Sequence, residues 1–422
     1  MGALGYANAM NSQIQTHTTD GYKCLKRSVL VALLAVSPFY MPAKVLAAEI
    51  RLYGGADVGV SYVHTSTNNQ SASRLGMDSG VLDDSMFGLR GTEDLSPDWS
   101  VGFDLASELE IQSGELAYNA FFGIESTLGL TRRGWGGLKL GRQQTVSTDF
   151  FTNIDPMGLS FGQSNMGTSF TAINTQIYNN LIQFTSATWS GLKVGLGYSF
   201  DTGDTAIYAG SSPPGVDEPV PSNNGFENSN KMRALTAAVQ YQAGPVLLAA
   251  SYDRAYASNK IPASSGTGTV SNPQSTSPQA WYLGAAITVE KVVVSAAWGR
   301  GINGALSGSG PGNDLSGSDL MSITGDGDIL FDPGFNHDSY LFGLSWAIND
   351  RTQFMTSWQM MKPKGRLAGV AQAASQQIVG AAMTYNLSKR TTAYVWASYG
   401  NNFEMVSGAK TSVIGSGIQT LF

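Results

Sequence analysis

The chain has 422 residues, of which 42% are hydrophobic and only 13% are charged, and it contains 50 glycines and a single cysteine. The glycines follow no triplet period, which excludes a collagen. The formal net charge of −6 and the absence of a basic run argue against nucleic acid as a partner. After the N-terminal region, no segment offers the ~20 consecutive apolar residues that a membrane-spanning helix needs. The class of protein that remains is a chain that folds mainly into β-strands.

The N-terminal segment has the three-part layout of a secretory signal. Basic residues at 23–27 precede the apolar run 28–36, and small residues close the segment at 45–48. We therefore predict a signal peptide over 1–47 and one exported domain over 48–422. A short membrane anchor is the alternative. The single cysteine lies within the signal, so the exported domain needs no disulfide framework.

From residue 49 onward, apolar and polar side chains alternate. In 50–62 the even positions are mostly apolar, whereas the odd positions include Arg51, Asp57 and Ser61. This period of two is typical of strands with one apolar and one polar face. It predicts sixteen strands, over 50–62, 85–95, 99–111, 118–130, 136–143, 181–189, 192–200, 231–242, 246–256, 281–289, 292–300, 340–348, 352–361, 377–387, 391–399 and 411–422.

The connections between these strands alternate in length. Two-residue turns such as 190–191 and 244–245 alternate with long loops rich in glycine, serine and asparagine, such as 201–230 and 303–338. In hydrocarbon only a closed sheet pairs every backbone group of such strands. The pattern therefore predicts an all-β fold, a sixteen-stranded antiparallel transmembrane β-barrel with short periplasmic turns and long extracellular loops. A soluble sandwich would alternate less regularly.

Aromatic residues give an independent indication of the same fold. They gather at strand ends on the apolar parity, where the two girdles of a membrane barrel are expected. The loop-side ends carry Tyr62, Phe200, Tyr252, Trp281, Trp298 and Tyr340, and the turn-side ends carry Trp99, Trp189 and Phe422.

Several stretches carry a family resemblance: 85–95 (SMFGLRGTEDL), 137–143 (GLKLGRQ), 180–186 (NLIQFTS), 191–198 (GLKVGLGY) and the terminal Phe422. They resemble strands two, five, six and seven and the sorting signal of the general trimeric porins of Gram-negative bacteria, of the neisserial and burkholderial type. Met86 stands where that family often has a lumen-side arginine, which weakens the expectation of an anion preference.

The resemblance implies a passive diffusion channel for small hydrophilic solutes and ions in the bacterial outer membrane. It implies a homotrimer with its interface near the first and last strands, and contact with outer-membrane lipid and lipopolysaccharide. Phe422 would be read by the barrel-assembly machinery during biogenesis. The connection 146–178 resembles the third loop, which folds inward and narrows the channel.

Strand parity predicts which charged side chains line the channel. Asp149 and Asp155 belong to the expected constriction loop, and Arg142 precedes it at an interfacial position or is turned inward by a bulge. Acidic groups exceed basic groups among these positions, so we expect a weak cation preference. The predicted pore-lining residues are Arg51, Arg90, Lys139, Lys193, Asp57, Asp104, Glu108, Glu110, Glu125 and Asp253.

Two other classes of function stay open. Residues 158–162 (GLSFG) fit the pattern of a hydrolase nucleophile elbow, with Ser160 as the nucleophile, but they lie in a loop with no expected helix behind it. A non-conducting barrel that acts as an adhesin or structural anchor is the other alternative. We expect no enzyme activity, no cofactor and no metal, because no cysteine or histidine cluster suggests zinc and the acidic residues at 326–332 lack the spacing of a calcium loop.

Overall fold

Alternating side chains give the strands two unlike faces, and the strands pair into one sheet that closes on itself. The computed structural model describes residues 49–118, 120–173, 176–203, 205–208, 231–257, 277–306, 328–365 and 373–422. The predicted signal peptide lies outside these residues. The long strands are β1 Glu49–Ser66, β2 Ser71–Ser79, β3 Met86–Asp94, β4 Trp99–Glu110, β6 Glu125–Arg132, β7 Gly136–Gln144, β8 Ile177–Ser186, β9 Leu192–Ser199, β11 Arg233–Ala243, β12 Val246–Tyr256, β13 Gln279–Val289, β14 Val292–Leu306, β15 Asp328–Ala347, β16 Thr352–Lys364, β17 Gln376–Asn386, β18 Thr391–Asn401 and β19 Lys410–Leu421.

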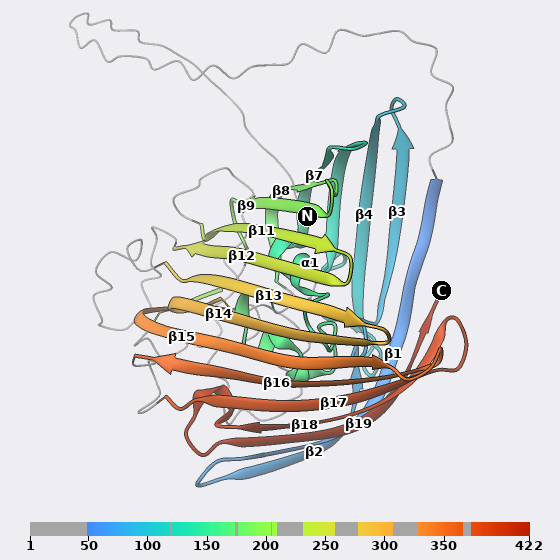
Figure 1. Ribbon diagram of the computed structural model, residues 1–422. Helices are drawn as coiled ribbons and strands as arrows, with labels where there is room; N and C mark the ends of the chain where they lie inside the picture. The colour runs from blue at the N-terminus through green and yellow to red at the C-terminus, as the bar shows by residue number, and fades with distance from the viewer. Residues whose placement is uncertain are drawn as a thin grey trace, which may run out of the picture. The chain divides into compact units, whose positions relative to one another are not determined.

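The sheet closes where β1 pairs with β19, in an antiparallel register that runs from Gly55 opposite Leu421 to Ser66 opposite Lys410. The other edge of β1 pairs with β3 in its first half and with β2 in its second half. Strands β2 and β3 therefore share one position, and the barrel has sixteen strands around its circumference, as predicted. Figure 1 shows the short turns at the right of the view and the longer connections at the left.

Two short strands of the described residues lie outside this ring of sixteen. β5 (Glu115–Leu116) forms a hairpin with the end of β4, and β10 (Thr205–Tyr208) pairs in parallel with the start of β15. The described residues include no helix that is long and apolar enough to cross a membrane.

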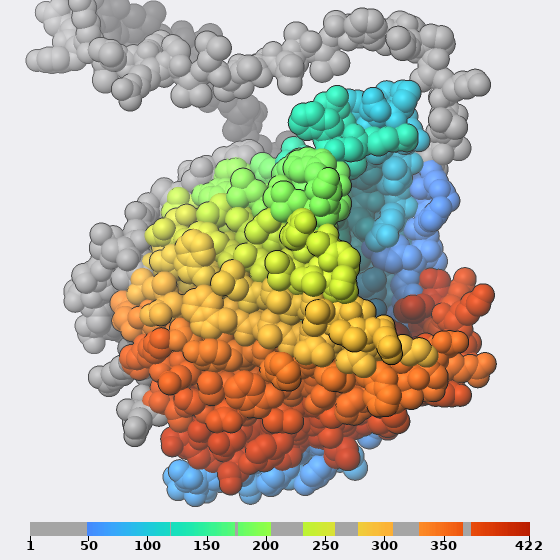
Figure 2. All heavy atoms as spheres, viewed as in Figure 1, coloured from blue at the N-terminus to red at the C-terminus, as the bar shows by residue number. Residues whose placement is uncertain are grey.

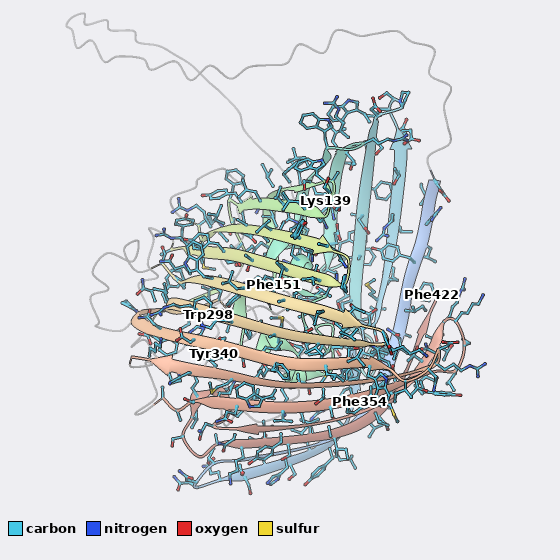
Figure 3. All side chains as sticks on the ribbon, viewed as in Figure 1. Lys139, Phe151, Trp298, Tyr340, Phe354 and Phe422 are labelled. Atoms are coloured by element: carbon cyan, nitrogen blue, oxygen red, sulfur yellow. The ribbon has the colours of Figure 1, made fainter. Side chains whose placement is uncertain are left out.

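Side-chain exposure alternates along each strand, so each strand has an exposed face and a buried face. On β1, Val60 and Tyr62 are exposed, whereas Ser61 and Val63 between and beyond them are buried. The aromatic girdles are present too: Trp298 and Tyr340 face each other across β14 and β15 toward the loop side, and Figure 3 places Phe422 at the turn side. The apolar parity thus forms the outside of the barrel, and the polar parity faces the lumen.

The structure corrects several predicted boundaries. β2 was not predicted, the strand predicted over 118–130 begins only at Glu125, and the strand predicted over 340–348 begins at Asp328. The connection after β7 also contains a helix that the sequence did not indicate, α1 Val146–Phe151, followed by the 3-10 turns Gly162–Ser164, Met166–Thr168 and Thr171–Ile173.

Candidate functional site: a narrowed lumen

The described residues of the connection between β7 and β8, 145–173 and 176, lie inside the barrel. Its apolar side chains Phe151, Ile154 and Phe170 are almost fully buried against inward-facing residues such as Tyr282 of β13 and Leu341 of β15. Burying large side chains of this kind contributes roughly 1.5–3 kcal/mol each. The segment is therefore packed against the barrel wall. We refer to residues 145–176 as the constriction loop.

Hydrogen bonds fasten the constriction loop to successive strands. The Gln359 amide of β16 donates to the carbonyls of Gln163 and Asn165, at 3.0 and 2.7 Å. The Gln163 amide donates to the Ser398 hydroxyl of β18 at 2.7 Å. The hydroxyl of Tyr282 accepts from the backbone N–H of Ala172 at 3.1 Å. The bonds of Gln359 and Tyr282 thus pair polar backbone groups of an irregular buried segment, and the bond to Ser398 adds a side-chain link to the wall.

Glycines on the wall make room for the constriction loop. A Cβ atom at Gly343 of β15 would lie 2.3 Å from Pro156, and one at Gly380 of β17 would lie 2.4 Å from the Ser164 hydroxyl. Neither glycine has a positive φ, so closeness to the loop is what restricts these positions. The high glycine content of the chain thus partly reflects loop docking.

A second segment folds inward between β2 and β3. Within residues 80–85, the carbonyl of Val81 accepts from the Phe161 N–H at 2.7 Å, and the carbonyl of Leu82 accepts from the Ser160 hydroxyl at 2.6 Å. Asp83 is exposed, and Asp84 is half-buried. Two carboxylates therefore lie beside the tip of the constriction loop.

Acidic surroundings affect the titration of this second segment. Burial, together with the neighbouring carboxylates of Asp83, Asp57 and Glu110, raises the pKa of Asp84 to about 7. Removing a carboxylate from water and placing like charges beside it both favour its neutral form.

On the facing wall, predicted lumen residues form ion pairs. Arg90 of β3 contacts Asp104 of β4 at 2.8 Å, and Arg90 also lies 4.3 Å from the ring centre of Tyr53, whose hydroxyl donates to Asp104. Lys139 of β7 pairs with Glu125 of β6. Each pair is cross-strand and partly exposed, so opposite charges on this wall largely compensate.

Asp149 of α1 faces the basic residues of that wall. Its side chain is exposed, yet surrounding protein raises the pKa of Asp149 to about 6, with Lys139 and Lys193 opposing the rise. The Lys193 ammonium lies 4.8 Å from the ring centre of Phe150, also in α1. The helix thus brings one carboxylate close to two lysines.

Asp155 has a different environment from Asp149. It is buried, and its carboxylate accepts backbone N–H bonds from Met157, Leu159 and Met166 at 3.2, 2.8 and 3.2 Å. Burial raises the pKa of Asp155 to about 6, and these three bonds oppose the rise. The side chain holds the turn of the constriction loop rather than facing a basic patch.

The turn at 158–162 has backbone angles that glycine favours. Gly158 and Gly162 have φ values of 64° and 55°, and Leu159 and Phe161 between them also have positive φ. The Ser160 hydroxyl donates to the Leu82 carbonyl. Between α1 and this turn the described chain contains no strand, so the strand, nucleophile and helix order of a hydrolase elbow is not formed.

Arg142 is turned by a β-bulge between Gly141 and Gln143, one of the two positions that the sequence left open. Its guanidinium donates to the Gly123 carbonyl at 2.5 Å and to Asn179 at 2.8 Å. It braces the connection after β4 against the start of β8.

The remaining predicted residues lie in β1, β4 and β12. Arg51 pairs with Glu49 at 2.6 Å at the turn-side end, and Glu110 accepts from Gln112 at the loop-side end. Glu108 is buried in β4, and Asp253 is buried in β12 near Ser147 of α1. Asp57 is buried in β1 and accepts bonds from the backbone N–H groups of Leu82 and Asp83.

Sequence reasoning missed Tyr53, Asp83 and Asp84. Tyr53 resembles any strand aromatic, and only the cross-strand register brings it to Arg90 and Asp104. The acidic pair at 83–84 lies next to a serine and could have been noticed as a polar break before the strand at 85–95. No group of three or more histidine, cysteine or acidic side chains is placed to hold a metal within the described ranges.

The geometry defines a class: a closed outer-membrane barrel whose lumen is narrowed by an inward loop between charged walls. The sequence profile of the Gram-negative porins matches residues 30–403. An outer membrane porin protein of Bordetella pertussis is 32% identical over 410 residues, which cover 94% of this chain and 100% of that protein. The chain belongs to the Gram-negative porin family, and it is located in the outer membrane.

Solved structures agree on the fold. The anion-selective porin from Comamonas acidovorans superposes with a TM-score of 0.63 at 19% identity, over 89% of this chain and 100% of that one. A trimer form of OmpT from Vibrio cholerae superposes with a TM-score of 0.53 at 12% identity, over 89% and 100% of the two chains.

Proposed function

We propose that this protein is a passive diffusion channel for small hydrophilic solutes and ions. The observation that carries the proposal is the constriction loop, which is fastened to β13–β18 inside a closed barrel and leaves charged side chains on the wall of β3–β7. Such a waist selects solutes by size and charge and needs neither energy input nor a cofactor.

The channel prefers cations weakly in this proposal. Arg90 with Asp104, and Lys139 with Glu125, form compensating pairs. In this proposal the waist also carries Asp83 and Asp84 from the second inward segment and Asp149 from α1. The other predicted pore-lining acids belong to the strands of the wall. The excess is small, and its effect should weaken as ionic strength rises because exposed charges are screened.

Planar bilayer recordings test both parts. Stepwise single-channel currents support the channel, and silence in a correctly folded preparation contradicts it. The reversal potential in a salt gradient gives the sign of the ion preference. A strong anion preference would overturn the charge argument while leaving the channel intact. The structurally similar porin from Comamonas acidovorans is named as anion-selective.

The proposal includes assembly and export. We infer a homotrimer with its interface near β1 and β19, an inference supported by the solved trimer form of a structurally similar outer membrane protein of Vibrio cholerae. Residues 1–47 would direct export, Phe422 would be read by the barrel-assembly machinery, and lipopolysaccharide would surround the outer rim. Chemical crosslinking and sizing in mild detergent test the trimer.

The alternatives predict different measurements. An adhesin or structural anchor would be silent in bilayers. A hydrolase would lose ester cleavage in Ser160→Ala, whereas the channel proposal expects no hydrolysis to lose, since the Ser160 hydroxyl donates to a backbone carbonyl. We therefore propose a protein without enzyme activity.

A further inference from the structure

An arginine on the lipid side of the turn-side rim lies close to the rings of two tryptophans. The guanidinium carbon of Arg132, the last residue of β6, is 5.6 Å from the ring centre of Trp99 and 5.1 Å from that of Trp135. Trp99 is directly opposite Arg132 in the β4–β6 register, and Trp135 belongs to the following turn. All three side chains are exposed.

The position of this cluster is set by strand parity. Leu128 and Leu130 precede Arg132 on the same face of β6 and are 57% and 39% exposed, as lipid-facing side chains are. The cluster therefore lies where the apolar band ends at the short turns. In Figure 2 the turns after β3 and β6 form the blue and turquoise projection at the upper right.

Hydrogen bonds hold three neighbouring turns together around the cluster. The backbone N–H of Arg133 donates to the Asp98 carbonyl at 2.8 Å, which joins the turn after β6 to the turn after β3. The indole N–H of Trp189, at the end of the next hairpin, donates to the Gly134 carbonyl at 2.8 Å. Hydrogen bonds between adjacent turns thus hold the backbone around Arg132, Trp99 and Trp135 in place.

Charge complementarity identifies the partner. Within the part of the chain that the structure describes, neither Arg132 nor Arg133 forms an ion pair, and the Asp98 carboxylate in the adjacent turn pairs with neither. Ring faces beside a guanidinium leave its in-plane N–H groups free to bind two phosphate oxygens. Tryptophan rings prefer the depth of lipid headgroups.

We propose that Arg132, framed by Trp99 and Trp135 and assisted by Arg133, binds the headgroup phosphate of a glycerophospholipid in the leaflet around the turn-side rim. This site is on the outside of the barrel and is independent of conduction. It fixes one lipid at the end of the β4–β6–β7 wall.

Native mass spectrometry of the detergent-purified protein tests the site. The protein is titrated with phosphatidylglycerol, and the lipid-bound fraction is compared between wild type, Arg132→Gln and the Arg132→Gln/Arg133→Gln double variant. A cation near an anionic lipid surface contributes about 1 kcal/mol, so each substitution should weaken lipid retention about fivefold. Arg132→Lys keeps the charge but loses the planar fork, and we expect intermediate retention.

The matched control is Arg390→Gln. Arg390 is an exposed arginine in the short turn between β17 and β18, and it contacts no aromatic ring among the described residues. It should retain lipid as the wild type does. Three results overturn the proposal: equal losses in Arg132→Gln and Arg390→Gln, displacement of the lipid by excess inorganic phosphate, or a change in subunit association with unchanged lipid retention. The last would identify a second copy of the chain as the occupant.

Discussion

The hydroxyl of Tyr394 in β18 donates a hydrogen bond to the carboxylate of Asp57 in β1, across the strand β19 that separates them. The same carboxylate accepts the backbone N–H groups of Leu82 and Asp83 at 2.6 and 2.9 Å. Because Leu82 in turn accepts from Ser160, the pair links the barrel closure to the tip of the constriction loop. The tip is therefore held through the second inward segment as well as through the wall.

Tyr394→Phe should loosen this tip. The substitution removes one donor to a buried carboxylate and keeps the ring, at a cost of about 1–3 kcal/mol. We expect noisier open-channel currents at a mean conductance similar to that of the wild type. Tyr399→Phe, on the exposed face of the same strand, is the control. If the current noise of both variants equalled that of the wild type, the hydrogen bond from Tyr394 to Asp57 would not contribute to holding the constriction loop.

Gly284→Val should displace the constriction loop. A Cβ atom at Gly284 would lie 2.8 Å from Ile154 and 2.9 Å from Phe151, so the loop must move. Overpacking of this kind costs about 1–3 kcal/mol. We expect a lowered thermal midpoint and a changed size limit in liposome swelling with sugars of increasing size.

Ala285→Val is the neighbouring control for that experiment. Ala285 is exposed on the lipid face of β13, so an added isopropyl group meets lipid rather than the loop. Its swelling rates should match those of the wild type. An unchanged size limit in Gly284→Val would show that the loop does not set the waist.

Asp149 should make ion preference depend on pH. Its pKa is raised to about 6, so the carboxylate is charged above that pH and becomes neutral as pH falls through it. Cation preference should therefore decrease below about pH 6. The reversal potential of Asp149→Asn should differ from wild type at pH 8 and converge with it near pH 5.

The remaining titration in that variant belongs to other groups. Asp84, with a pKa of about 7, should still lower the cation preference as pH falls through neutrality. Asp98→Asn, in a turn-side connection, serves as the control that leaves the waist unchanged. A reversal potential that is flat in wild type between pH 5 and 8 would contradict both assignments.

The strands were predictable because a closed membrane barrel imposes period two on one face of every strand. The failure at β2 has a physical reason: in Ser71–Ser79 only Leu75 and Met77 are large and lipid-facing, so the alternation is weak. The inward segment that follows interrupts the strand position. A polar interruption in the alternation therefore predicts a loop, even where the chain continues as a strand of the sheet.

The site was predictable in part. Parity predicted that Arg90, Asp104, Glu125 and Lys139 line the channel. The structure brings them together as two ion pairs, Arg90 with Asp104 and Lys139 with Glu125. The choice of ion-pair partner depends on the register between neighbouring strands. The periodicity of a single strand carries no information about that register. The partners of Asp155 are backbone N–H groups of its own loop, and residue types alone do not indicate them.

Removal of Phe422 should impair barrel assembly in cells while leaving the stability of the folded barrel nearly unchanged. The residue is 55% exposed, and its backbone N–H donates to the Gly54 carbonyl at 3.0 Å, a bond worth about 1 kcal/mol. Refolding of the shortened chain into detergent micelles should therefore stay close to that of the wild type. In cells, where the proposed signal must be read, the amount of heat-modifiable barrel in the outer membrane should fall strongly. Phe422→Tyr keeps the terminal aromatic and should assemble normally. Equal losses in micelles and in cells would make Phe422 a structural residue rather than a signal.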